Sequence, residues 1–441
     1  MSFPKRNRGK AIQTPWFSEI PEEWETKPIK AALTAVSRPV GDSWSDTTLL
    51  SLTQSGIIPR DIESGKGKFP TDFSSYQHVK PDDLIFCLFD IDETPRAVGL
   101  SKLDGMVTGA YSVFEANKGN SPGYLSYFFH WIDDGKLLRP YYTGLRKVVR
   151  PQTFGAINIP LPPFSEQGQI ANFLDRETAK IDALIAEQQR LIELLQEKRQ
   201  AVISHAVTKG LNPNAPMKDS GVEWLGEVPE HWEVKPMRYT HTKKSGGTPS
   251  KSEERYWLGG EIPWASSKDL KQEKIDDTID HITDAAVSEG AAELRPAGMV
   301  LICVRGMILA HTLPVSISTV PMSINQDLKA LIPCEGVSVE YLAAMLRGAS
   351  KEILARVDEA AHGTKVLRMN DFDSFVVAIP PLEEQEEIIQ FINQELDAIA
   401  ALQASSIKST HLLIERRSAL ISAAVTGQID VRGLATEEEV A

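Results

Sequence analysis

The chain has 441 residues, 42% of them hydrophobic, and a formal net charge of −13. This length predicts two or three domains, and the acid excess argues against a protein that binds nucleic acid through an evenly basic surface. No run approaches the ~20 apolar residues that cross a bilayer, and no apolar segment follows the basic start, so we expect a cytoplasmic protein that makes no membrane contact. The three cysteines are far apart, which predicts reduced core residues and no metal site.

The first predicted element is an entry segment that occurs twice. Residues 16–28 and 224–236 share the pattern Trp-x₄-Pro-x₂-Trp. Large aromatic side chains bury much apolar area. We therefore expect these tryptophans to pack at the edge of a domain in each copy.

Both copies continue with matching short elements. Residues 81–89 and 296–304 are apolar runs entered by a turn, which predicts a buried strand in each. Short helices are predicted after them, at 124–131 and 339–346. Between these shared parts the copies diverge, so the frame is repeated and the domain interiors differ.

Two long helices are predicted at 165–212 and 382–430. Each follows a proline pair, which is tolerated ahead of a helix but not inside one. Apolar residues then recur at steps of three and four, close to a heptad. About 44 residues at ~1.5 Å each make a rod of roughly 65 Å, so an antiparallel coiled coil is expected. The alternative is that each helix packs only on its own domain.

The apolar residues at this spacing are expected to bury in the helix pair or to dock another subunit. They are Ile170, Phe173, Leu184, Leu191 and Leu195 in the first helix, with Leu194 in the same repeat, and Ile388, Phe391, Ile399, Leu413 and Leu420 in the second.

The predicted plan is domain, helix, domain, helix. The fold class is α+β, with two similar globular domains at 1–164 and 213–381 joined by two long antiparallel helices as a coiled coil. Such a tandem repeat predicts pseudo-twofold symmetry. Residues 431–441 form an acidic tail that is predicted to be disordered.

This pattern resembles the specificity (S) subunit of type I restriction–modification enzymes. The resemblance covers nearly the whole chain. It rests on the repeated Pro-Pro-x-x-Glu-Gln at 162–167 and 380–385, the Trp/Pro/Trp entries, the Ala-Val-Thr helix ends at 206–210 and 424–427, and 246–250 with 262–264.

The resemblance implies a division of labour. Each globular domain would be a target recognition domain that reads one half of a split duplex DNA site, and the coiled coil would fix the gap between the halves. Two modification subunits, which carry the adenine methyltransferase chemistry and bind S-adenosylmethionine, would dock beside the helices. Two restriction subunits, where present, would add ATP- and magnesium-dependent translocation and cleavage. This chain itself would bind no cofactor.

The residues themselves predict no catalytic site. Leu161 precedes Pro162-Pro163 where an adenine methyltransferase motif needs Asn or Asp, and no glycine-rich loop follows a strand. Residues 65–68 do not match a phosphate-binding loop, because Phe69 stands in place of Ser or Thr. The acidic residues Asp90, Asp92 and Glu93 are interpreted as a solvated loop. An orphan methyltransferase is therefore the least favoured function.

Reading DNA needs cations and amides for bases and phosphates, carried on loops. The candidates in the first domain are Gln54, Arg60, Lys66, Lys68, Arg146 and Lys147. Those in the second are Lys243, Lys244, Gly246, Gly247, Thr248, Lys251, Lys268, Arg305, Thr364 and Lys365. Lys147 and Lys365 occupy matching places ahead of the long helices. Trp257 and Trp264 are expected to be core residues.

Two functions stay open at this point. The first is a non-catalytic DNA sequence-specificity subunit, which the polar Lys- and Gly-rich loops favour. The second is a non-catalytic scaffold that holds two protein partners at a fixed distance. Net acidity favours the scaffold, since residues 383–441 contain 4 basic and 11 acidic side chains.

Overall fold

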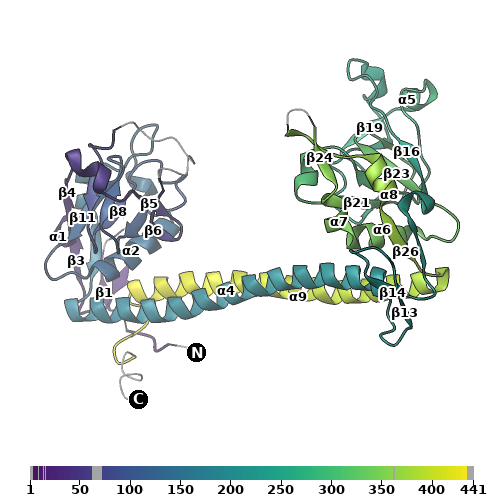
Figure 1. Cartoon of the computed structure of the whole chain (residues 1–441). Helices are drawn as coiled ribbons and strands as arrows, with labels where there is room; N and C mark the ends of the chain where they lie inside the picture. The colour runs from purple at the N-terminus through teal and green to yellow at the C-terminus, as the bar shows by residue number, and fades with distance from the viewer. Residues whose placement is uncertain are drawn as a thin grey trace. The chain divides into compact units, whose positions relative to one another are not determined.

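The computed structural model describes residues 3–434 apart from 8, 13, 15, 62–71, 361 and 362. The chain forms two compact units: unit 1 combines Met1–Gln188 with Lys408–Ala441, and unit 2 is Gln189–Ile407. The division falls inside two long helices, α4 (Phe164–Lys209) and α9 (Leu382–Val425) (Figure 1). The predicted α+β class with two long helices is confirmed.

Unit 1 is built on an antiparallel sheet in the order β4-β11-β8-β9. Its buried strand β8 (Leu84–Phe86) lies within the run predicted at 81–89, and helix α2 (Pro122–Asp134) covers β9. Strand β12 pairs with β3 just before α4 begins. The other elements are β1 (Lys10–Ala11), β2 (Glu19–Ile20), β3 (Glu25–Pro28), α1 (Ile29–Ala32), β4 (Leu33–Val36), η1 (Gly41–Asp46), β5 (Leu50–Thr53), β6 (Gly56–Pro59), β7 (Gln77–Val79), β9 (Val98–Leu100), β10 (Gly105–Val107), β11 (Ser112–Ala116), η2 (Arg139–Tyr141), α3 (Pro151–Ala156) and β12 (Asn158–Leu161).

Unit 2 repeats this frame around a larger sheet in the order β16-β23-β20-β21-β18. Strand β20 (Val300–Cys303) is the second predicted buried strand, and α6 (Val339–Gly348) is the second predicted short helix. In a smaller sheet, β19-β17-β22, strand β17 runs parallel to β22, and in unit 1 an isolated parallel bridge joins Leu49 to Met106 of β10. The other elements are β13 (Met217–Asp219), β14 (Glu227–Pro229), β15 (Glu233–Pro236), η3 (Met237–Tyr239), β16 (His241–Ser245), η4 (Glu254–Tyr256), β17 (Ile262–Ala265), β18 (Lys274–Ile275), β19 (Asp280–Ile282), α5 (Asp284–Ser288), η5 (Met307–Ala310), β21 (Val315–Ser318), β22 (Ser323–Ile324), β23 (Leu328–Pro333), α7 (Ser350–Leu354), β24 (Val357–Glu359), β25 (Lys365–Leu367), α8 (Met369–Ser374) and β26 (Val376–Ile379).

Within each unit, half of α4 lies antiparallel beside half of α9 (Figure 1). In unit 1, Arg417 Nε donates to Asp182 Oδ1 at 2.9 Å. Buried and half-buried positions of α4 recur at steps of three and four through Ile181, Ile185, Gln188, Ile192 and Leu195. This is the spacing of a coiled-coil seam.

The seam is narrower than the apolar pattern suggested. Ile170, Phe173, Leu195, Ile388, Ile399 and Leu420 are buried, and Leu413 is half-buried. Leu184, Leu191 and Phe391 are exposed, so their prediction as helix-pair residues is wrong. Only the a and d positions of a heptad face the partner helix, and apolar residues one position away fall outside the seam. Their use in docking another subunit stays a prediction.

The repeated glutamine is a buried link between each long helix and its domain. Gln167 accepts from the Ser121 amide at 2.8 Å and donates to the Pro162 carbonyl at 2.9 Å. Gln385 accepts from the Ser338 amide at 2.8 Å and donates to the carbonyls of Gly336 and Pro380. Both glutamine side chains are buried, and they satisfy the carbonyls of Pro162 and Pro380, which are buried with them.

The helix ends pack on the entry tryptophans. Gly210 follows α4 with φ 71° and Gly427 follows α9 with φ 67°. A Cβ at Gly427 would lie 2.6 Å from Pro21, and one at Gly210 would lie 3.2 Å from the Trp232 ring. Trp24 and Trp232 are themselves buried, as the entry pattern predicted. None of the described helices is long and apolar enough to cross a membrane.

Candidate nucleic-acid interface

In unit 1 the loop after β8 meets the segment that leads back to α3. The amide of Val149 donates to the Leu88 carbonyl at 2.9 Å, and the amide of Asp90 donates to the Arg146 carbonyl at 2.9 Å. We name residues 88–90 together with 143–149 the first corner. It brings the predicted residues Arg146 and Lys147 to the end of a buried strand.

Unit 2 contains the same junction. The amide of Leu367 donates to the Val304 carbonyl and that of Gly306 to the Lys365 carbonyl, both at 2.9 Å. Arg305 forms an isolated β-bridge with Val366. We name residues 304–308 together with 364–367 the second corner. It unites three of the predicted residues, Arg305, Thr364 and Lys365.

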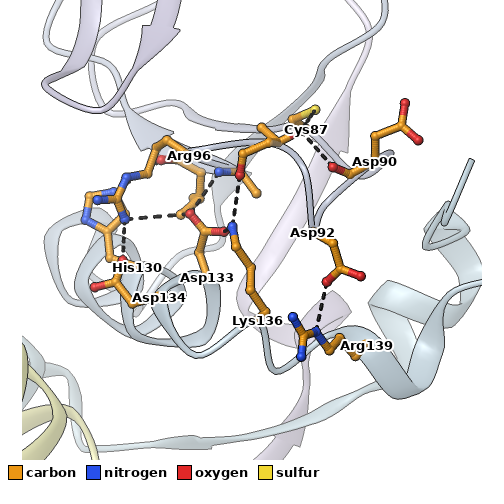
Figure 2. A network of polar contacts seen from close by, with 12 residues as sticks. Cys87, Asp90, Asp92, Arg96, His130, Asp133, Asp134, Lys136 and Arg139 are labelled. Carbon is orange, nitrogen blue, oxygen red and sulfur yellow. Dashed lines mark hydrogen bonds and ion pairs between the residues drawn. The ribbon is translucent and has the colours of Figure 1, made fainter. Parts of the chain in front are cut away.

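An aspartate organises the cations beside the first corner. Asp92 accepts from Arg139 Nε at 2.9 Å, accepts from the Tyr142 hydroxyl, and lies 3.4 Å from Lys147 Nζ (Figure 2 labels Asp92 and Arg139). The hydrogen bonds from Tyr142 and then Arg139 lower the pKa of Asp92 to about 2. Burial, followed by the bond to Asp92, raises the pKa of Tyr142 to about 12. Asp92 thus lies in a solvent-accessible loop, as interpreted from the sequence, but its side chain is fixed there by hydrogen bonds and ion pairs.

The same loop is tied to α2 by a buried carboxylate (Figure 2). Asp133 accepts from Lys136 Nζ at 2.7 Å and from the Ala97 amide at 2.8 Å, and lies 3.6 Å from Arg96 Nη1. Burial lowers the pKa of the neighbouring His130 to about 4. Its imidazole is therefore neutral near pH 7, and the network around Asp133 needs no further cation to balance it.

The other four candidates of unit 1 lie in a different part of it or outside the described residues. Gln54 is exposed in the turn between β5 and β6, and Arg60 is exposed directly after β6. The ring of Tyr111 stacks on Phe89 of the first corner, and burial raises the pKa of Tyr111. Lys66 and Lys68 lie outside the described residues.

In unit 2 the conformation of the loop that contains Gly246 and Gly247 is fixed by its packing against Ile324. A Cβ at Gly246 would lie 1.9 Å from the Ile324 carbonyl oxygen, whereas nothing lies within 4 Å of one at Gly247. The Gly247 amide donates to Ile324 O at 3.0 Å, and Thr248 Oγ1 donates to Gln326 Oε1 at 2.6 Å. The glycine at 246 is thus required by the close approach of the chain's own backbone, and its predicted contact with DNA is not needed to explain it.

We expect Gly246→Ala to displace this loop and lower the free energy of unfolding by about 1–3 kcal/mol, the usual cost of overpacking. Gly247→Ala is the matched control and should change it by less than about 0.5 kcal/mol. Denaturant unfolding of both variants measures the difference. Equal effects would show that the contact with Ile324 O does not constrain the loop.

The lysines around this loop have different surroundings. Lys243 pairs with Asp373, while Lys244 is exposed on β16. Lys251 lines a hollow of about 590 Å³ with Trp257, Trp264 and Asp280. The two indoles meet edge to face at 5.2 Å, and Trp264 is buried.

Lys268 lines a separate hollow of about 360 Å³, together with Asp269, Asp276 and Asp277. Across the described residues, no group of three His, Cys, Asp or Glu side chains could hold a metal ion. The cysteines are free thiols, with Cys87 and Cys303 buried.

Sequence reasoning missed Asp92, Arg139 and Tyr142. Asp92 lies 47 residues from Arg139 and 50 from Tyr142 along the chain, so no local pattern joins them. The density of cations between 139 and 150 was a usable signal. It marks the segment as basic without showing which carboxylate orders it.

Comparisons with known proteins agree with this duplicated architecture. Residues 229–408 match the family model described as "Type I restriction modification DNA specificity domain". The chain is 28% identical to the EcoR124I/EcoR124II specificity subunit of Escherichia coli, over 61% of this chain and 63% of that subunit. The alignment thus spans less than two thirds of that relative. A putative MjaX specificity subunit of Methanocaldococcus jannaschii is 23% identical over 94% of this chain and 96% of its own.

A solved structure shares the fold. It concerns the complex assembly and conformational transition of the type I R-M system, and its matching chain has a TM-score of 0.70 at 17% identity, covering 93% of this chain and 99% of its own. The class defined by two α+β units and two paired long helices is therefore a known one. In sequence over residues 229–408, and in fold over most of its length, the chain is similar to type I restriction–modification specificity subunits.

Proposed function

We propose that this chain is the DNA sequence-reading subunit of a type I restriction–modification complex. Each unit would bind one part of a split duplex site, and the long helices would serve as the spacer. The observation that carries this proposal is the duplicated corner, which presents Arg146 and Lys147 in unit 1 and Arg305 and Lys365 in unit 2 at the end of equivalent buried strands.

The electrostatics of the corners suit a polyanion. Arg146 and Arg305 are exposed and make no ion pair with any described residue. Lys147 pairs with Asp92 and Glu93, and Lys365 pairs with Glu359 at 2.8 Å. Exposed ion pairs contribute little free energy, so phosphate oxygens can replace these carboxylates at small cost. Arg at such a position is also the side chain that reads guanine most often.

The chain would have no catalytic step of its own. The relatives are specificity subunits by name, and the chemistry would reside in partner subunits that bind S-adenosylmethionine for methylation, with ATP and magnesium where a restriction subunit takes part. Exposed leucines of the long helices, such as Leu184 and Leu191, are the surfaces we assign to two methyltransferase subunits. The net charge of −13 fits a reader whose partners supply further phosphate contacts.

Genome-wide adenine methylation, measured in a strain with its native modification subunit and with or without this chain, tests the proposal. We expect methylation at one split motif to vanish with the chain. Arg146→Gln and Arg305→Gln should each relax recognition in one half of that motif, while Arg190→Gln, which changes an exposed residue of α4 paired with Glu193, should not.

If methylation stayed unchanged at every motif while the modification subunit was active, the proposal that this chain reads DNA would be refuted, and a protein-binding scaffold would be favoured. Loss of methylation without relaxed recognition in either arginine variant would place base reading elsewhere in the units.

A further inference from the structure

Each corner also carries an exposed apolar side chain that covers no core. Leu145 is fully exposed between Gly144 and Arg146 in unit 1. Met307 is 62% exposed two residues after Arg305 in unit 2. A single exposed apolar residue needs no explanation, but here an exposed leucine or methionine occurs at the same hydrogen-bonded junction in both units, and Ile308, beside Met307, is 40% exposed as well. The two come from opposite strands of the junction, so they are not copies of one repeated residue.

Leu145 is presented on an ordered hairpin. Thr143 and Val148 exchange backbone hydrogen bonds of 3.0 and 3.1 Å, and the Lys147 amide donates to the Gly144 carbonyl at 3.1 Å. Gly144 and Lys147 have positive φ angles of 74° and 46°, which close the turn. The loop after β8 also holds this hairpin, because Asp92 accepts a hydrogen bond from Tyr142 and forms an ion pair with Lys147. Leu145 is thus exposed on a hairpin whose backbone is fixed by hydrogen bonds.

Met307 is fixed in a comparable way. Gly306 has a φ of 147°, and its amide donates to the Lys365 carbonyl, so the short helix η5 starts at the second corner. Arg305 on the preceding position is bridged to Val366. The cation and the thioether side chain therefore project from one short, hydrogen-bonded segment.

We propose that Leu145 and Met307 are wedges that insert between base steps when each unit binds duplex DNA. This rests on the proposed function and deepens it. Apolar side chains such as Leu and Met unstack and kink a duplex in this way in other proteins, and the energy of unstacking is offset by closer contact with the protein. A protein partner with an apolar groove suits these side chains less well, since it would also desolvate the cations beside them.

The test uses the full chain with its modification subunit and the duplex motif identified by methylation. Leu145→Ala and Met307→Ala should each weaken binding about tenfold while leaving its salt dependence unchanged, because no phosphate contact is lost. Lys365→Gln, at a lysine that we assign to phosphate, should instead lower the slope of log K against log salt by about one. Leu103→Ala and Leu294→Ala, at exposed leucines of units 1 and 2 outside the corners, should bind like the wild type.

A duplex with a mismatch at the wedged step provides the decisive comparison. Its bases are already unstacked, so the loss of binding affinity caused by Leu145→Ala should be smaller on that duplex. The fluorescence of 2-aminopurine placed at this step should rise when the wild type binds but not when the variant binds. Equal losses on matched and mismatched duplexes at every step, or no loss at all, would overturn the wedge. A wild-type complex without salt-dependent binding to the motif would instead refute the proposed function.

Discussion

Leu195→Asp should separate the two helix halves of unit 2, whereas Leu194→Asp should have almost no effect. Leu195 is 6% exposed in the seam and Leu194 is 44% exposed beside it. Burial of a leucine side chain contributes about 1.5–3 kcal/mol, and a carboxylate cannot remain in an apolar seam without a partner. We expect a loss of about 4 kcal/mol or more for Leu195→Asp and less than about 1 kcal/mol for Leu194→Asp.

Denaturant unfolding followed by circular dichroism measures both values, and hydrogen exchange shows whether the loss lies in α4 and α9. The apolar repeat alone predicts equal damage at the two leucines. Similar effects of both substitutions would therefore mean that the seam is not where the burial pattern of α4 puts it.

The second large effect is expected at the repeated glutamine. Gln385→Leu keeps the size of the side chain but removes the partners of the Ser338 amide and of the Gly336 and Pro380 carbonyls. The buried Pro380 carbonyl left without a partner costs about 1–3 kcal/mol, and the half-buried Ser338 amide adds to this cost, whereas water can reach the exposed Gly336. We therefore expect unit 2 to lose about 2 kcal/mol or more. Thermal unfolding measures the loss, and faster exchange of the Ser338 amide should accompany it.

Gln390→Leu is the matched control, because Gln390 is exposed on the same helix. Gln167→Leu should reproduce the defect in unit 1 through Ser121 and Pro162. If Gln385→Leu and Gln390→Leu were equally mild, the repeated motif would owe its spacing to something other than this link.

The sequence predicted the long helices and buried strands that the two units share, because local residue patterns specify them. Periods of three and four identified α4 and α9, and apolar runs identified β8 and β20. The glutamine motif was recognised as a repeat, but its role was not. The partner amides lie 46 and 47 residues away, and only the folded domain brings them near.

The candidate site shows the same limit. Arg305 and Lys365 were chosen separately for their charge, and pairing between distant segments makes them neighbours. Gly246 was recognised as a position of close approach, but the approaching group is the Ile324 carbonyl. Composition identifies which residues are basic, and long-range contacts decide which of them share a surface.

The two units differ in when they can be completed during synthesis. Unit 2 is one continuous stretch, Gln189–Ile407, whereas unit 1 needs Lys408–Ala441 as well. Its core includes Leu420, Ile421 and Val425, and the Arg6 amide bonds to the Gln428 carbonyl. On the ribosome the second unit can therefore close first. Until Lys408–Val425 has been made, unit 1 lacks part of its core, and the α4 residues that pack on α9 in this unit stay uncovered.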